Sequence, residues 1–96
     1  MITNFADQTT TDIYNGQNTK AARQVPRLVW GAAGRKLTMI NAAQDVLDLR
    51  APPSNHLEKL HGDLDGFFSI RVNDQYRVIF RFANGQASDV KIVDYH

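Results

Sequence analysis

Three arginines are predicted to share one face of a β-hairpin in the second half of the chain. Residues 67–73 and 76–82 each alternate large apolar side chains with polar ones, the period of a half-buried strand. With the apolar residues on one face, Arg71 lies directly opposite Arg77 on the other, and Arg81 follows further along. Because guanidinium groups bind phosphate oxygens in a paired geometry, we interpret the polar face as a phosphate-binding surface.

The arginine pair also has an interpretation that needs no ligand. Like charges opposite each other in a sheet are destabilising, unless a carboxylate or a change of geometry relieves the repulsion. Asp63, Asp65 and Asp74 lie nearby in the sequence, and a bulge would separate the two guanidinium groups. Both alternatives remain open from the sequence.

Histidine and tyrosine side chains add groups for acid–base chemistry. His61 lies in the turn that enters the hairpin, Glu58 is a carboxylate close to it, and Tyr95 and His96 occupy the last two positions. Cleaving RNA without a metal requires a base for the 2′-hydroxyl, an acid for the leaving 5′-oxygen and cations for the charge on phosphorus. Imidazole suits both proton roles, and tyrosine can donate a hydrogen bond or stack on an unpaired base. These residue types favour a ribonuclease.

Other chemistries find less support. The sequence has no phosphate-cradling glycine-rich loop, no HExxH pair and no GxSxG elbow. His56, His61, Asp63 and Asp65 lie close together, but their spacing matches no metal-binding motif. We therefore expect neither a metal nor another cofactor.

Composition and length limit the possible classes of protein. The 96 residues predict a single small domain, 1–96, and the lack of cysteine gives no argument for secretion. No apolar run approaches the length of a membrane span, and the first residues do not resemble a signal peptide. We expect a cytoplasmic protein without a membrane partner.

The charge is unevenly distributed along the chain. The net charge of +1 is too small to indicate nucleic-acid binding. However, residues 1–36 contain five basic and two acidic side chains, whereas residues 37–65 contain two basic and five acidic ones. Such segregation often marks only a solvated face, so both interpretations remain open.

The first half of the chain has the spacing of a helix. Over residues 21–43, apolar side chains recur every three or four positions and predict one buried stripe: Val25, Val29, Ala33, Leu37 and Ile40. Pro26 fits the first turn, while Gly31 and Gly34 each weaken the helix by roughly 1 kcal/mol and would permit a break. Shorter elements are expected as a strand at 2–5 and single helical turns at 11–14 and 45–49.

The second half has the spacing of a sheet. A short strand is expected between Leu57 and Leu60, and a three-residue connection at 73–75 predicts three cross-strand pairs: Val72 with Tyr76, Ile70 with Val78, and Phe68 with Phe80. The dipeptide at 84–85, Asn-Gly, predicts a further tight hairpin, with a bulge or longer loop to bring the next apolar residues inward. The fold class is therefore α+β, an antiparallel β-sheet meander packed against one or two N-terminal helices.

Residues 57–80 resemble a known family. Their sequence, LEKLHGDLDGFFSIRVNDQYRVIF, follows the pattern LxxLxGxxxGxxSIxVxxx(W/Y)R(I/V)xF of HigB-type toxins, and the ending D-Y-H is typical of the same family. The beginning of the chain and residues 35–43 match as well, so the resemblance covers nearly the whole length. It identifies a HigB-type toxin, similar to the GraT-like members, in the RelE/ParE superfamily with its RelE-like fold.

The resemblance implies a ribosome-dependent mRNA endoribonuclease of a type II toxin–antitoxin system. Such toxins enter the ribosomal A site, cut the mRNA codon there and thereby inhibit growth. A HigA-like helix-turn-helix antitoxin holds them inactive and represses the shared operon, so operator DNA is contacted only through the antitoxin.

Site residues follow from the same resemblance. Arg77 would contact the scissile phosphate, and Asp94, Tyr95 and His96 would form the catalytic C-terminus, with His96 transferring protons. The expected RNA- or phosphate-binding residues are Arg71, Arg81, His61, Lys59 and Tyr76. Some members have histidine and lysine in place of Glu58 and His61, and tryptophan in place of Tyr76, which indicates weaker or differently tuned cleavage.

Two other functions remain as alternatives. A toxin of the ParE branch would act on DNA gyrase without cutting nucleic acid, although the D-Y-H ending argues against it. A regulatory binding module with a degenerate site is the other.

Overall fold

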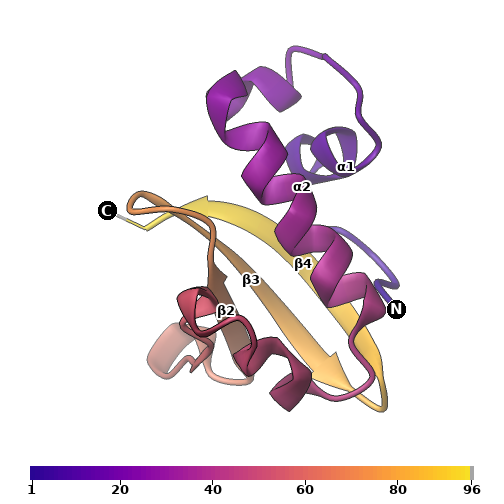
Figure 1. The fold of residues 1–96 in the computed structure, drawn as a ribbon. Helices are drawn as coiled ribbons and strands as arrows, with labels where there is room; N and C mark the ends of the chain where they lie inside the picture. The colour runs from indigo at the N-terminus through magenta and orange to yellow at the C-terminus, as the bar shows by residue number, and fades with distance from the viewer. Residues whose placement is uncertain (96) are drawn as a thin grey trace.

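Two helices cover one face of a four-stranded antiparallel sheet in this computed structural model, which describes residues 1–95 (Figure 1). The strands lie in the order β1-β2-β3-β4, and α2 packs on β3 and β4 while α1 packs on α2 and β4. The helices and strands are α1 (Gln8–Tyr14), α2 (Arg27–Ala42), β1 (Glu58–Lys59), β2 (Phe67–Arg71), β3 (Tyr76–Ala83) and β4 (Gln86–Asp94). The predicted α+β meander is confirmed. None of the helices in residues 1–95 is long and apolar enough to cross a membrane.

The predicted long helix forms in two pieces. A short 3-10 helix, η1 (Ala22–Gln24), precedes α2, and Pro26 is the N-cap of α2 with a ψ of 137°, rather than a residue of its first turn as predicted. The proline therefore separates the two pieces. The helix α2 continues through Gly31 and Gly34 without a break. All five stripe residues are buried as predicted: Val25, Val29, Ala33, Leu37 and Ile40.

The N-terminal segment differs in detail from the prediction. The expected strand at 2–5 makes only two isolated parallel bridges to β4, from Ile2 and Phe5. The expected helical turn is longer, because the Asp7 side chain accepts a hydrogen bond from the Thr10 N–H and caps α1. The predicted turn at 45–49 forms as η2 (Val46–Arg50).

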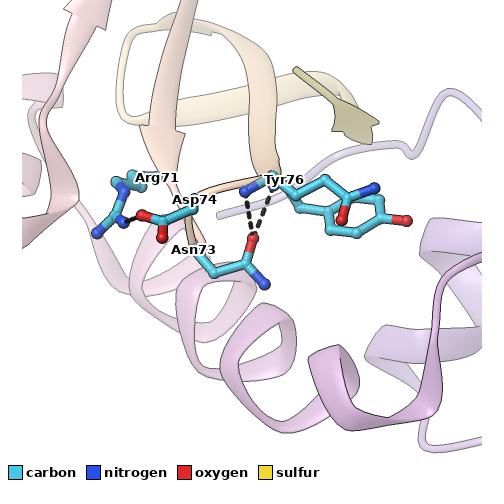
Figure 2. Close-up of polar contacts among 5 residues, drawn as sticks. Arg71, Asn73, Asp74 and Tyr76 are labelled. Atoms are coloured by element: carbon cyan, nitrogen blue, oxygen red, sulfur yellow. Dashed lines mark hydrogen bonds and ion pairs between the residues drawn. The ribbon is translucent and has the colours of Figure 1, made fainter. Parts of the chain in front are cut away.

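The first hairpin has the predicted register. Phe68 pairs with Phe80, Ile70 with Val78, and the Val72 N–H donates to the Tyr76 carbonyl. The Asn73 side-chain oxygen accepts hydrogen bonds from the backbone N–H groups of residues 75 and 76, which closes the three-residue connection (Figure 2). Arg71 consequently lies opposite Arg77, as predicted.

The second hairpin contains the expected bulge. Asn84 and Gly85 have φ values of 54° and 76°, so the turn is the tight two-residue type. The register then shifts between Ile79 and Arg81, and Asp89 takes a left-handed φ of 51°. This extra residue reverses the alternation of β4, so that Val90 and Ile92 are buried while Lys91 is exposed.

Candidate active site

Arg77 lies at the centre of a set of polar contacts on the sheet face that α2 does not cover. Its side chain is only 10% exposed. Nε donates to the Ser69 hydroxyl at 2.9 Å, one terminal nitrogen donates to the His56 carbonyl at 2.6 Å, and the other lies 3.3 Å from Glu58 Oε1. The guanidinium group is therefore held in one position before any ligand arrives.

Strand pairing brings two of these partners to the arginine. Glu58 pairs with Ser69 across β1 and β2, and direct cross-strand partners point to the same face. Arg77 shares that face because its cross-strand partner, Arg71, is two positions from Ser69. This face of the sheet is the one that the helices do not cover.

A turn before β1 supplies the carbonyl. The short helix η3 (Pro53–Asn55) ends at His56, whose φ of 45° is left-handed and uncommon for a residue with a side chain. Asn55 is fully buried and donates to the carbonyls of Leu49 and Ala51. These bonds fix the turn, and the turn directs the His56 carbonyl at Arg77.

Tyr95 covers the guanidinium of Arg77. Its ring lies 5.3 Å from the central carbon of the guanidinium, and its backbone N–H donates to the Gln75 carbonyl at 2.7 Å. The contact has the geometry of a cation–π interaction. The structure thus brings together two of the predicted site residues, Arg77 and Tyr95. His96, another predicted catalytic residue, lies outside the described residues.

The side chain of Asp94, the last residue of β4, lies on the helix side of the sheet. It pairs with Tyr76, whose side chain belongs to the core, and its carboxylate accepts a hydrogen bond from the Gln75 side chain at 3.1 Å. Asp94 is therefore next to Tyr95 in the chain but does not share the face of Arg77.

The other two arginines lie on the Arg77 face, and each has a carboxylate of its own. Arg71 forms an ion pair with Asp74, visible at the end of the hairpin in Figure 2. Arg81 lies 3.5 Å from Asp89 and 4.4 Å from the centre of the Phe67 ring. Of the three carboxylates considered from the sequence, Asp74 does neutralise one arginine, and no bulge separates the pair. The repulsion between Arg71 and Arg77 alone is therefore no sign of a bound anion.

Three predicted phosphate-binding residues are not in contact with Arg77. Tyr76 is 7% exposed and packs in the core on the helix side of the sheet. Lys59 pairs with Phe68 and so points to that same side. His61 is exposed at the start of η4 (Gly62–Leu64), and no contact joins it to Arg77 in the described structure.

Lys36 of α2 contacts the turn that precedes β1. Lys36 donates to the Asn55 side-chain oxygen at 2.6 Å. Burial lowers the pKa of Lys36, and the positive charges of Arg35 and Arg71 lower it further. Among residues 1–95, no three histidine, aspartate or glutamate side chains gather closely enough to hold a metal ion.

Comparison with known proteins now gives the family. The family model described as "RelE-like toxin of type II toxin-antitoxin system HigB" matches residues 3–96 of the chain. The chain belongs to the HigB-like toxin family. The toxin HigB-1 of Vibrio cholerae serotype O1 is 42% identical to this toxin over 87 residues, which are 91% of this chain and 90% of the relative. Endoribonuclease HigB of Proteus vulgaris is 34% identical over 64 residues, 64% of this chain and 65% of the relative.

Solved structures confirm the predicted RelE-like fold of the toxin. In the YoeB–YefM complex from Staphylococcus aureus, a chain 21% identical superposes with a TM-score of 0.63, covering 100% of this chain and 95% of that one. YafQ from E. coli strain BL21(DE3) is 14% identical and has a TM-score of 0.66, with coverage of 99% and 92%. These identities are low, so the likeness concerns the fold alone.

Proposed function

We propose that this HigB-like toxin is an endoribonuclease that cuts mRNA on the ribosome through its own acid–base groups. The observation that carries the proposal is the fixed guanidinium of Arg77, held by Ser69, His56 and Glu58 beneath the Tyr95 ring. The Proteus relative, 34% identical, is itself named an endoribonuclease. A preorganised cation of this kind stabilises the charge that develops on a phosphate during cleavage.

The proposed reaction uses the 2′-hydroxyl of the RNA as the nucleophile. A general base takes the proton of the 2′-hydroxyl as its oxygen bonds to phosphorus. The bond from phosphorus to the 5′-oxygen breaks, which leaves a 2′,3′-cyclic phosphate, and a general acid gives a proton to the leaving 5′-oxygen. Arg77 stabilises the added negative charge, and Tyr95 stacks on a base or donates a hydrogen bond to the phosphate. We assign His96 to proton transfer because imidazole titrates near neutral pH.

Access to Arg77 requires an exchange of partners. In the free toxin the guanidinium faces Glu58, whose side chain is 50% exposed, and Tyr95, which is 47% exposed. Both groups have room to move, whereas the buried Ser69 and the His56 carbonyl belong to the sheet and its supporting turn. We infer that the substrate phosphate takes the place of Glu58 and that the buried partners hold the guanidinium in position.

The proposed partners follow from the family. A toxin of a type II system has an antitoxin, for which we propose a HigA-like helix-turn-helix protein, and the Staphylococcus structure is itself a YoeB–YefM complex. The proposed substrate is mRNA in the ribosomal A site, which would place the activity in the cytoplasm.

Primer extension on a translated mRNA tests the proposal. Purified toxin should produce new 5′ ends within codons when ribosomes are present and none on the same mRNA without them. His96→Ala should reduce the cleavage rate by about 10²–10⁴-fold, the usual contribution of a proton-transfer group. Absence of cleavage together with inhibited DNA supercoiling by gyrase would support the ParE-like alternative instead. Equal cleavage without ribosomes would leave a ribonuclease but contradict its dependence on the ribosome.

A further inference from the structure

A hollow of about 570 Å³ lies where α1 meets the outer side of α2. Its lining residues are Tyr14, Trp30, Gly31, Gly34, Arg35, Thr38 and Met39, which we call the α2 groove. Leu28 extends it, because positions 28, 31 and 35 follow helical spacing on one face, and the Leu28 side chain is 99% exposed. The lining residues belong to α1 and α2. These helices cover one face of the sheet (Figure 1), and Arg77 lies on the other face.

The fold does not require glycine at either glycine position of the groove. Neither has a left-handed φ. A side-chain carbon built at Gly34 would meet no atom within 4 Å, and one at Gly31 would meet only the flexible end of Arg35 at 3.6 Å. Glycine in a helix interior is less stable than alanine, so the fold alone would favour alanine at both positions. Without side chains at these positions, the exposed backbone of α2 leaves space for a side chain of another molecule.

Two arginines border the groove: Arg35 lines it, and Arg27 contacts the Trp30 ring. Between Asp12 and Asp45 the sequence has no acidic residue to offset their charge. Arg27 is the first residue of α2, where the helix dipole disfavours a cation, and its guanidinium lies 5.5 Å from the Trp30 ring centre. An apolar floor with a basic rim fits a partner that is apolar on one side and acidic on the other.

We propose that the α2 groove docks an acidic amphipathic helix of the antitoxin. Its apolar side chains would cover Leu28, Trp30 and the glycine backbone, and its carboxylates would pair with Arg27 and Arg35. RNA would be attracted by the arginines alone, because its backbone is anionic. The exposed Leu28 and the two glycines have a use only for an apolar partner surface, so they favour an amphipathic helix over RNA. The proposal rests on the proposed function, since it takes the antitoxin as partner, and it leaves Arg77 uncovered on the other side of the sheet.

Trp30 is the only tryptophan in the chain, so its fluorescence reports directly on the groove. The probe is a synthetic helical peptide of about 15 residues, with leucine at every third or fourth position and glutamate elsewhere. Titration into the whole toxin should shift Trp30 emission to shorter wavelength. A matched peptide with lysine in place of glutamate should bind at least about tenfold more weakly.

Substitutions localise the binding. Gly34→Leu has space to fold and fills the groove, so it should weaken the acidic peptide at least about tenfold without lowering Tm or RNA cleavage. Arg35→Glu should weaken it as well, whereas Arg50→Glu, the same charge change at an exposed residue of η2, should not.

Four results would overturn the proposal: equal binding of the two peptides, no emission shift, unaltered binding by Gly34→Leu, or a Trp30 shift with an RNA oligonucleotide instead of the acidic peptide. RNA cleavage by the same toxin is a separate readout. Normal cleavage with no peptide binding would reject only the groove, and peptide binding without cleavage would reject only the proposed nuclease.

Discussion

Arg77→Ala should lower the rate of mRNA cleavage by about 10²–10³-fold, the usual loss when one preorganised donor is removed from a developing negative charge. Arg77→Lys should be almost as impaired. A lysine keeps the charge, but its single ammonium cannot reproduce the planar fork that reaches Ser69, His56 and Glu58 together. The measurement is single-turnover cleavage of mRNA on programmed ribosomes.

Folding must be separated from chemistry in this experiment. Removal of the guanidinium leaves the Ser69 hydroxyl and the His56 carbonyl without their partner, so Tm should also fall. Rates are therefore compared below the unfolding transition of each variant. Arg81→Ala is the matched control, because Arg81 lies on the same face but is 50% exposed with a weak surface ion pair. Cleavage by folded Arg77→Ala at the normal rate, or an equal loss in Arg81→Ala, would show that the site is misplaced.

Phe80→Ala should destabilise the toxin by about 3–5 kcal/mol, a large part of the stability of a small domain. Phe80 is the largest fully buried side chain and contacts Phe68 and Phe82, with ring centres 6.2 Å and 6.5 Å away. Alanine would leave a cavity that the packed helices and strands cannot fill. Urea unfolding followed by circular dichroism measures the change.

Phe67→Ala is the matched comparison for the core prediction. Phe67 is the neighbour of Phe68 on the other face of the sheet, where it is partly exposed and stacks on Arg81. Its removal should cost clearly less than removal of Phe80. If the two substitutions cost the same, or if Phe80→Ala costs less than about 1 kcal/mol, Phe80 is not the centre of the core.

Periodicity predicted the parts of the fold that bury an apolar face. Pairing Ile70 with Val78 also places Phe68 opposite Phe80 on the same face, and a slip of one residue would move one strand's apolar side chains to the other face. The bulge before Val90 was predictable for the same reason, since the tight turn and the burial of Val90 are incompatible without an extra residue. The split of the helix at Pro26 depends on local geometry that apolar spacing does not report.

The site was predicted only in part because the groups that hold Arg77 come from two kinds of segment: a strand with a regular polar alternation, and a turn with no regular pattern. Arg77 and Tyr95 were identified, but Ser69 and the His56 carbonyl were not assigned as their support. The Ser69 contact was open to prediction, since the residue alternates onto the arginine face and lies in the family motif. The His56 carbonyl was not, because residues 50–57 have no periodic pattern and their path depends on buried Asn55. Tyr76 falls in the core because strand alternation opposes it to Arg77.

Cryo-electron microscopy of the toxin on a ribosome tests the role of Arg77 most directly. The A-site codon would carry 2′-O-methyl groups, which prevent attack by the 2′-oxygen and preserve the uncut RNA. We expect a guanidinium nitrogen of Arg77 within about 3 Å of an oxygen of the scissile phosphate, with Glu58 displaced and the bond to Ser69 kept. A phosphate bound by Arg71 or Arg81, with Arg77 still paired to Glu58, would contradict the proposed site.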